Sequence, residues 1–231
     1  MSTKVILLHG AIGAADQLLP LKTELEKRGA SCFPFEFSGH GKTPVSQTGF
    51  GIQYFATELK EFILINNLQQ AHVFGYSMGG YVALYLMAAE INLLGNIATL
   101  GTKFDWNLET ALKESKMLNP EQIELKVPKF AESLAVRHGA ANWKELLART
   151  AKMMIDLGNH NLLSAEKLKS IENKVMLGLA DNDNMVSYDE TKHVFNQLKS
   201  KQFYMLPNTK HPIESVNVDL LSHLLLDFYK S

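Results

Sequence analysis

Residues 75 to 79 read Gly-Tyr-Ser-Met-Gly and place a hydroxyl group that can act as a nucleophile, that of Ser77, between two glycines. An apolar run, residues 71–74, comes directly before this segment, and a nearly all-apolar helical run follows it. The G-x-S-x-G pattern in this setting is typical of a serine at the tip of a sharp strand-to-helix turn. Such a turn strains the backbone and needs small neighbours, which the glycines at positions 75, 79 and 80 supply. The segment predicts a nucleophile for acyl transfer, with the Met78 amide facing the developing oxyanion.

A serine hydroxyl becomes a good nucleophile when a base removes its proton, and the eight histidines are the candidates. His211 follows the last predicted strand, residues 202–206, in a loop at the edge of the sheet where sites of parallel α/β folds collect. His40, between two glycines, is the competitor, although its position suits a residue that shapes its loop. Five more lie on predicted helices or strands: His72, His138, His160, His193 and His223. We therefore expect His211 to be the base.

The base needs a carboxylate that orients the imidazole and stabilises its charged form. Asp181 and Asp183 both follow the predicted strand at residues 174–179, at the same edge of the sheet. Asp105, just after the fourth predicted strand, is a more remote alternative. The residues alone leave the choice between Asp181 and Asp183 open.

A second donor for the oxyanion is expected near the N-terminus. Residues 5–8 form an apolar strand, and a loop with glycines at positions 10 and 13 follows it. Such a loop can place a backbone amide, that of Ala11, opposite the Met78 amide. We expect His9, at the start of this loop, to fix the loop through hydrogen bonds.

Two segments resemble binding loops for other ligands and fail on inspection. Residues 41–43, Gly-Lys-Thr, look like the end of a phosphate-binding loop, but Glu36 occupies the position of its first glycine. Residues 181–184 begin like a calcium loop, but Met185 and Val186 follow, where an oxygen ligand and then a glycine are required. The sequence therefore predicts neither a metal nor a cofactor.

The residues above must be positioned by a regular framework, and the chain alternates apolar strands with helical patterns. This alternation is typical of repeated βα units on a mostly parallel sheet of about six strands flanked by helices. The whole chain, 1–231, is expected to form one α/β domain. The predicted strands are residues 5–8, 32–37, 71–74, 97–100, 174–179 and 202–206.

From about residue 104 to 163 the strand rhythm stops and helical segments replace it, which predicts a helical cap inserted into the domain. Helix boundaries are indicated at Pro120, Pro128 and Gly139. Large apolar side chains of this insertion could line a substrate cavity or form plain core. We select three of them as candidate substrate-binding residues: Trp106, Trp143 and Met153.

Composition excludes several classes of protein. The 23 basic and 24 acidic residues give a net charge of -1 without a long run of either sign, so no surface for nucleic acid is predicted. The apolar stretch after residue 4 is too short for a signal peptide or membrane span. We expect a cytoplasmic protein without membrane contact that acts on a small molecule as a monomer or dimer. The one cysteine, Cys32, lies in an apolar run and is expected to be buried.

Taken together, these residues resemble the α/β-hydrolase superfamily. The His-Gly pair at residues 9–10, the Ser-Gly-His-Gly segment at residues 38–41, and then Ser77, Asp183 and His211 fall in the family's order of nucleophile, acid and base. In this family the acid commonly precedes a valine by three residues, as Asp183 precedes Val186, and the resemblance thus favours Asp183 over Asp181. The early first strand is similar to that of the minimal members, which include plant hydroxynitrile lyases and methyl-ester esterases.

The resemblance implies a carboxylesterase-like serine hydrolase that cleaves an ester or thioester through an acyl-enzyme. The same residues also allow hydrolysis of a carbon-carbon bond or a lyase reaction, because the cap selects the substrate. A non-catalytic ligand-binding protein on the same fold is the alternative from another class.

Overall fold

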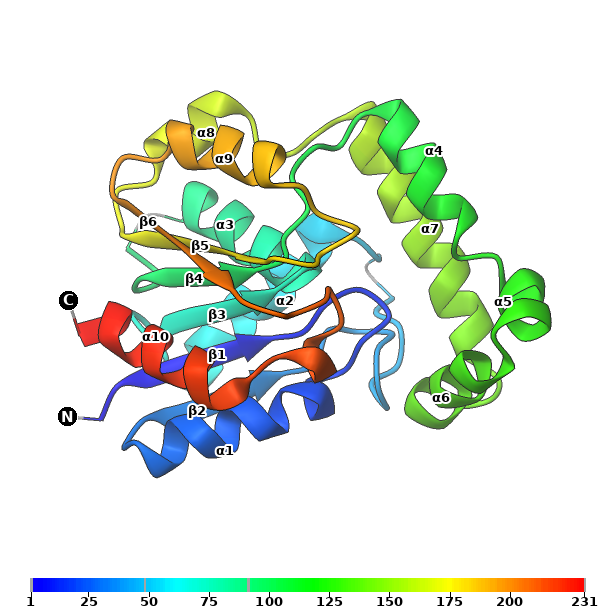
Figure 1. Cartoon of the computed structure of the whole chain (residues 1–231), viewed down its shortest axis with the longest axis horizontal. Helices are drawn as coiled ribbons and strands as arrows, with labels where there is room; N and C mark the ends of the chain where they lie inside the picture. The colour runs from blue at the N-terminus through cyan, green and yellow to red at the C-terminus, as the bar shows by residue number, and fades with distance from the viewer. Residues whose placement is uncertain (1, 48, 91, 231) are drawn as a thin grey trace.

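The computed structural model of the chain describes residues 2–47, 49–90 and 92–230. A six-stranded sheet lies at its centre, with the strand order β2-β1-β3-β4-β5-β6 and parallel pairing throughout (Figure 1). The predicted sheet is confirmed, and each predicted strand overlaps an observed one. The strands are β1 (Lys4–Leu8), β2 (Ser31–Phe35), β3 (His72–Tyr76), β4 (Ile97–Leu100), β5 (Val175–Ala180) and β6 (Lys201–Leu206).

Helices cover both faces of the sheet (Figure 1). One face carries α1 (Leu19–Lys27) and α10 (Val218–Lys230), and the other carries α2 (Ile52–Ile65), α3 (Met78–Ala89), α8 (Ala165–Ser170) and α9 (Tyr188–Gln197). Two short 3-10 helices, η1 (Ala15–Leu18) and η2 (Ile213–Ser215), complete this part of the chain.

The inner strands β1, β3, β4 and β5 are buried on both faces along most of their length, as expected for a parallel sheet between two helical layers. In β1, Ile6 and Leu8 point into the core under α2 and α3, whereas Val5 and Leu7 point into the core under α1 and α10. All four side chains are fully buried, so β1 is apolar without alternation. Cys32 is buried as predicted, and this burial raises the pKa of its thiol to about 12.

Between β4 and β5 the chain leaves the sheet and forms four helices beyond the ends of the strands, at the right of Figure 1. Asn107 and Asn119 cap two of these helices with their side-chain oxygens, and prolines start two of them. The helix boundaries predicted at Pro120, Pro128 and Gly139 are confirmed. The helices are α4 (Leu108–Lys116), α5 (Pro120–Lys126), α6 (Pro128–His138) and α7 (Trp143–Asn159).

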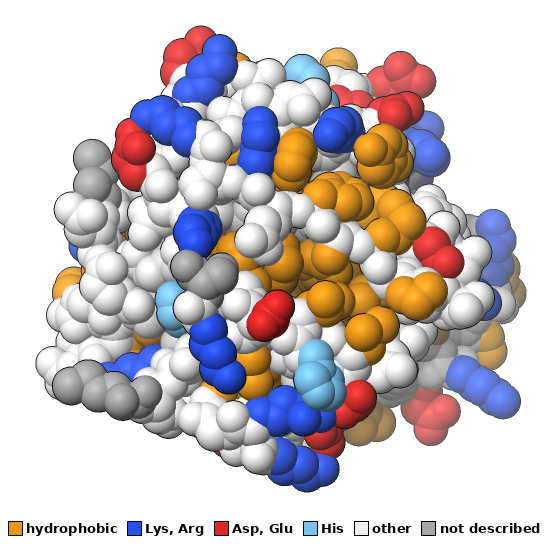
Figure 2. All heavy atoms as spheres, turned by 60° about the vertical axis from the view of Figure 1, so that its left-hand side comes forward, with side chains coloured by type: hydrophobic (Ala, Val, Ile, Leu, Met, Phe, Trp, Pro, Cys, Tyr) orange, Lys and Arg blue, Asp and Glu red, His pale blue; other side chains and the backbone are white. Residues whose placement is uncertain are grey.

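The surface on the side of the two chain ends is mixed. Figure 2 shows a group of hydrophobic side chains near the centre of this view, with Lys, Arg, Asp and Glu side chains around it. The edge strand β6 exposes Met205, of which 45% is accessible. No helix in the three described stretches combines the length and the apolar character that crossing a membrane requires.

Candidate active site

Ser77 sits on a strained turn between β3 and α3. Its φ of 50° and ψ of -117° place it outside the regions that a non-glycine residue normally adopts. The amide of Ser77 donates to the Leu100 carbonyl at 2.9 Å, and the Thr102 hydroxyl donates to the Ser77 carbonyl at 3.0 Å. A Cβ atom added at Gly75 would lie 2.5 Å from the backbone of Gly80. The turn thus requires glycine where the sequence predicts that it does.

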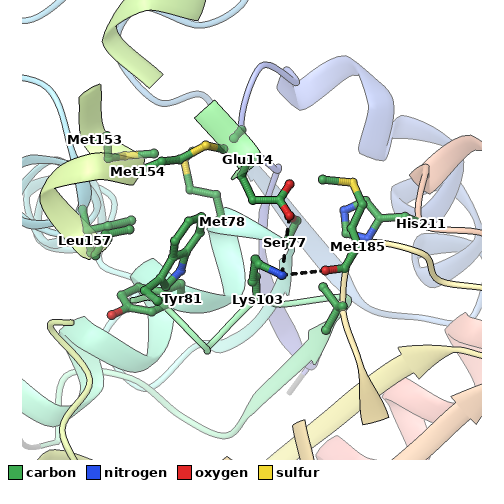
Figure 3. Close-up of a pocket in the computed structure, with 14 residues that line it drawn as sticks. Ser77, Met78, Tyr81, Lys103, Glu114, Met153, Met154, Leu157, Met185 and His211 are labelled. Carbon is green, nitrogen blue, oxygen red and sulfur yellow. Dashed lines mark hydrogen bonds and ion pairs between the residues drawn. The ribbon is translucent and has the colours of Figure 1, made fainter. Parts of the chain in front are cut away.

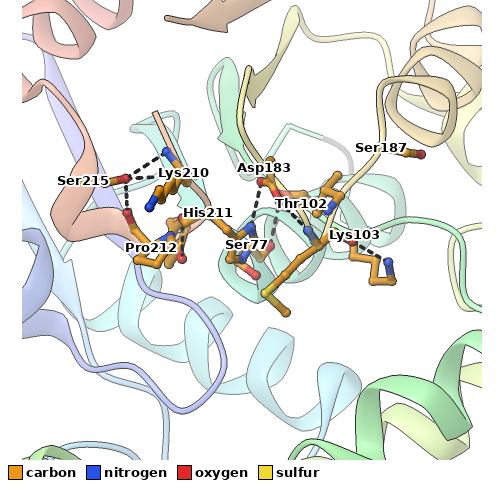
Figure 4. A network of polar contacts seen from close by, with 12 residues as sticks. Ser77, Thr102, Lys103, Asp183, Ser187, Lys210, His211, Pro212 and Ser215 are labelled. Carbon is orange, nitrogen blue, oxygen red and sulfur yellow. Dashed lines mark hydrogen bonds and ion pairs between the residues drawn. The ribbon is translucent and has the colours of Figure 1, made fainter. Parts of the chain in front are cut away.

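His211 and Asp183 form a hydrogen-bonded pair at the same edge of the sheet (Figure 4). The His211 Nδ1 lies 2.7 Å from Asp183 Oδ2, and the two side chains are 9% and 1% exposed. The other carboxylate oxygen, Oδ1, accepts from the amides of Met185 at 2.8 Å and Val186 at 2.9 Å. Burial opposes ionisation of Asp183, but the hydrogen bond and charge of His211 and the two amides outweigh it and lower its pKa. The pair therefore holds Asp183 as a carboxylate facing the imidazole.

Asp181 has a different position. Its carboxylate accepts from the amides of Asn208 at 2.8 Å and Thr209 at 2.9 Å, in the loop that leads to His211. The structure thus brings Asp183, and not Asp181, to the imidazole, while Asp181 fixes the loop that carries it. Asp105 is exposed and contacts Asn107, at 3.3 Å.

Tyr76, next to the serine, joins the two halves of the site. Its hydroxyl donates to the His211 carbonyl at 2.9 Å, and its ring centroid lies 5.5 Å from that of His211. The strand that carries the serine thereby also holds the loop of the histidine.

The Ala11 and Met78 amides are the predicted donors to an oxyanion. Both residues line the same cavity as Ser77 and His211. Met78 is the first residue of α3, where a helix leaves its amides without an internal partner. Across the described part of the chain, neither amide donates to another protein group. Both amides are therefore free to donate hydrogen bonds to an oxygen atom of a ligand in this cavity.

Two buried histidines hold the loop of Ala11. The Phe37 amide donates to His9 Nε2 at 3.2 Å, a Glu36 carboxylate oxygen lies 3.0 Å from the same nitrogen, and His9 Nδ1 contacts the Gly10 carbonyl at 2.8 Å. In the same way the Gly41 amide donates to His138 Nδ1, and His138 Nε2 donates to the Ile12 carbonyl, both at 2.9 Å. Burial lowers the pKa of His138, which agrees with a neutral ring that uses both nitrogens. The helix α6 is thus tied to the loop that carries Ala11.

His40, the competing base, is buried beside these two rings. Its Nδ1 contacts the Ser38 carbonyl at 3.1 Å and its ring stacks on Phe50, 5.8 Å away. Burial lowers its pKa well below the usual range. The ring shapes its loop and lines none of the cavities that contain Ser77. Among the described residues, no three His, Cys, Asp or Glu side chains are placed to hold a metal ion.

Two cavities meet at the serine, and Ser77, Met185 and His211 line both. The inner cavity, about 50 Å³, is mainly apolar and extends towards α3, α4 and α7 (Figure 3). The outer cavity, about 520 Å³, extends past Pro212 and Glu214. Of the three predicted substrate-binding residues, Trp106 and Met153 line the inner cavity.

The structure does not bring Trp143 to the site. Its side chain, 4% exposed, packs in a separate cluster between α5, α6 and α7, with Ile123, Leu134 and Leu147. Trp143 begins α7, whereas Met153 lies in the half of that helix that reaches the serine. The prediction that Trp143 lines the substrate cavity is therefore wrong. The helix α7 is long enough for its two ends to bury their apolar faces against different partners.

Sequence reasoning missed a group of charged side chains beside the inner cavity. Lys103 and Glu114 both line it, and the Lys103 Nζ donates to the Met185 carbonyl at 2.7 Å. Each of two carboxylates, Glu114 and Glu190, has an oxygen 3.8 Å from this Nζ. The side chains of Lys103, Glu114 and Glu190 are 16%, 7% and 8% exposed. Burial raises the pKa of Glu190, and the charge of Lys103 opposes this.

A signal for Glu114 was present in the sequence. Glu114 follows Ala111 by three residues, and both lie on the buried face of α4. A carboxylate on the apolar face of a helix is unusual, because burial of a charge requires a partner.

A parallel sheet with a serine on a strained turn after β3, and an Asp-His pair from the loops after β5 and β6, defines the α/β-hydrolase class of fold. The model of the alpha/beta hydrolase fold family matches residues 3–153, more than half of the chain. The chain therefore belongs to this family. The comparison with curated proteins gives no match.

Many solved structures share the fold. An esterase from Exiguobacterium antarcticum is 15% identical, with a TM-score of 0.79, and the match covers 100% of this chain and 92% of the esterase. NosK from Streptomyces actuosus is 17% identical with a TM-score of 0.82, covering 100% and 98%. A carboxylesterase structure from Nitrososphaera gargenis is 15% identical with a TM-score of 0.80, covering 99% and 90%.

Proposed function

We propose that this protein is a serine hydrolase that cleaves a carboxylic ester or thioester of a small molecule. The observation that carries the proposal is the meeting of three groups at one edge of the sheet. Ser77 lies on its strained turn, His211 lines the same two cavities, and Asp183 holds the imidazole at 2.7 Å. The esterase names among the structural neighbours agree with this chemistry.

In the proposed reaction the Ser77 Oγ attacks the carbonyl carbon while the His211 Nε2 accepts its proton. The carbonyl oxygen becomes negative and is stabilised by the amides of Met78 and Ala11. His211 then protonates the leaving alcohol or thiol, and the carbon-oxygen or carbon-sulfur bond breaks to give the acyl-enzyme. Water, activated by His211, releases the acid and restores Ser77. Asp183 stabilises the imidazolium in both halves of the reaction.

The two cavities suggest how a substrate lies. The leaving group receives its proton from His211, and the outer cavity continues past this residue along Pro212 and Glu214. The inner cavity continues from Met78, whose amide is one of the oxyanion donors. We therefore assign the acyl group to the inner cavity and the leaving group to the outer one.

A fluorophosphonate probe tests the nucleophile, because it reacts with an activated serine and leaves other serines unmodified. We expect rapid labelling of the wild-type protein and none of Ser77→Ala. Ser133→Ala is the matched control, since Ser133 is an exposed serine that lines the outer cavity and should leave labelling unchanged. Labelling of Ser77→Ala at the wild-type rate would rule out the proposal.

A further inference from the structure

Glu114 places a carboxylate in a cavity whose other walls are mainly apolar. It comes from α4 and lines the inner cavity together with Ser77, Met78 and Met153 (Figure 3). Over the described residues, the carboxylate contacts one charged group, the Lys103 Nζ at 3.8 Å, which is longer than a hydrogen bond. A carboxylate can accept about four hydrogen bonds, so Glu114 has unused acceptor capacity inside the cavity.

The charge of Lys103 is balanced by groups of the protein itself. Its ammonium has three donors, one of which binds the Met185 carbonyl at 2.7 Å. The carboxylates of Glu114 and Glu190 lie at 3.8 Å on the same ammonium group. Two carboxylates thus face one ammonium group, and a substrate carboxylate would meet Glu114 as a like charge. Lys103 and Glu114 together therefore offer a ligand a hydrogen-bond acceptor and little net positive charge.

From these contacts we infer that the inner cavity selects a short acyl group carrying a hydrogen-bond donor, a hydroxyl or an ammonium, which binds the Glu114 carboxylate. This inference rests on the proposed function and on the assignment of the acyl group to the inner cavity. The apolar wall of Met78, Trp106 and Met153 contacts the methylene groups of the chain. Glu114 acts here as a residue that determines specificity and takes no part in the chemical steps.

Four ethyl esters with related acyl chains test the inference. They are ethyl pentanoate, ethyl 4-hydroxybutanoate, ethyl 4-aminobutanoate and monoethyl succinate, which end in methyl, hydroxyl, ammonium and carboxylate groups. Titration of the released acid gives kcat/KM for each. We expect kcat/KM for the two donor esters to exceed that for ethyl pentanoate by about tenfold or more, which is the scale of one hydrogen bond to a charged group. The carboxylate ester should be the poorest substrate.

Glu114→Gln separates specificity from structure. Glutamine keeps the size and an acceptor oxygen but removes the charge, so the preference for the ammonium ester should fall about tenfold while the hydroxyl ester keeps most of its advantage. Glu109→Gln is the matched control, because Glu109 is an exposed glutamate on the same helix. It should leave all four values unchanged. An equal loss for all four esters in Glu114→Gln would show a purely structural role and overturn the inference.

The wild-type protein alone tests the inference if Glu114→Gln does not fold. Hydrolysis of p-nitrophenyl acetate without any preference among the four esters would refute the donor-selecting cavity and leave the proposed function intact. If no ester is hydrolysed, calorimetric binding to Ser77→Ala replaces kinetics. Tighter binding of ethyl 4-aminobutanoate than of ethyl pentanoate would then support the cavity assignment, and equal binding would overturn it.

Discussion

At the scale of single residues, the two oxygens of the Asp183 carboxylate have separate partners. Oδ2 faces the His211 imidazole, while Oδ1 accepts from the amides of Met185 and Val186. The amides fix the orientation of the carboxylate, and the carboxylate fixes the ring. Because Met185 also lines both cavities, the same contacts shape the space around the serine.

Replacement of Asp183 by asparagine should lower kcat for p-nitrophenyl acetate by about 10³- to 10⁴-fold, on the scale seen for other triads. The asparagine amide keeps the shape but cannot stabilise the imidazolium, and it favours the wrong tautomer of His211. Asp181→Asn is the matched control, because Asp181 contacts the loop amides of Asn208 and Thr209 and not the ring. A loss of kcat in Asp181→Asn as large as in Asp183→Asn would contradict the assignment of the acid.

The places of Ser77, His211 and Asp183 in the fold could be predicted from sequence because each follows a strand that can be recognised by its apolar residues. The residues alone left Asp181 and Asp183 equivalent, since both lie in one loop after one strand. Their separation depends on side-chain directions within that loop, which become known only from the structure. The place of Lys103 and Glu114 in the cavity could not be predicted either, because charged residues after a strand and on a helix normally face water.

At the scale of elements, α6 is joined to the loops beneath it through His138. The ring accepts from the Gly41 amide and donates to the Ile12 carbonyl, so it must be neutral. Burial lowers its folded pKa below the ordinary value of about 6.5. The stability contributed by this neutral ring is therefore present above about pH 6.5 and is lost as pH falls through the folded pKa.

The melting temperature of the wild-type protein should fall more steeply between pH 7 and pH 5 than that of His138→Gln, whose side chain does not titrate. His223→Gln is the control, since His223 is exposed on α10, and its melting temperature should follow the wild-type curve. Equal slopes for the wild-type protein and His138→Gln would show that protonation of His138 does not change the stability of the protein. Melting followed by circular dichroism gives all three curves.

The limits of prediction for the helices of the insertion also lie at this scale. The apolar residues of α7 repeat at helical spacing along its whole length, from Trp143 through Leu147 to Met153 and Leu157. This period predicts that one face is buried but not against what. The first half of the face packs on α5 and α6, and the second half faces the serine. Trp143 and Met153 were for this reason indistinguishable in sequence.

At the scale of the whole molecule, the size of the inner cavity sets the length of acyl chain that the proposed substrate can have. A cavity of about 50 Å³ holds roughly three or four groups the size of a methyl group. The fold could be predicted from the alternation of strands and helices, but this volume could not, because it depends on how α4 and α7 lie over the sheet. Short acyl chains fit the cavity as it stands.

We expect kcat/KM for p-nitrophenyl butanoate to exceed that for the octanoate by at least about tenfold, because each methylene group that does not fit forfeits burial energy or strains the wall. Met153→Ala enlarges the inner cavity and should raise kcat/KM for the octanoate relative to the butanoate. Met117→Ala is the control, since Met117 is 65% exposed on the same insertion. An unchanged ratio in Met153→Ala would show that the acyl chain lies elsewhere.

The helical segment between β4 and β5 has a consequence for folding during synthesis. Ile97 pairs with Val175, so β4 remains an open edge until the ribosome has delivered the five helices α4 to α8 and then β5. The serine turn can form early, since β1, β3 and β4 already surround it, but Asp183 and His211 emerge near the end of synthesis. In the proposed mechanism, a nascent chain would therefore carry the serine without the base that activates it, and would gain reactivity only as the sheet is completed.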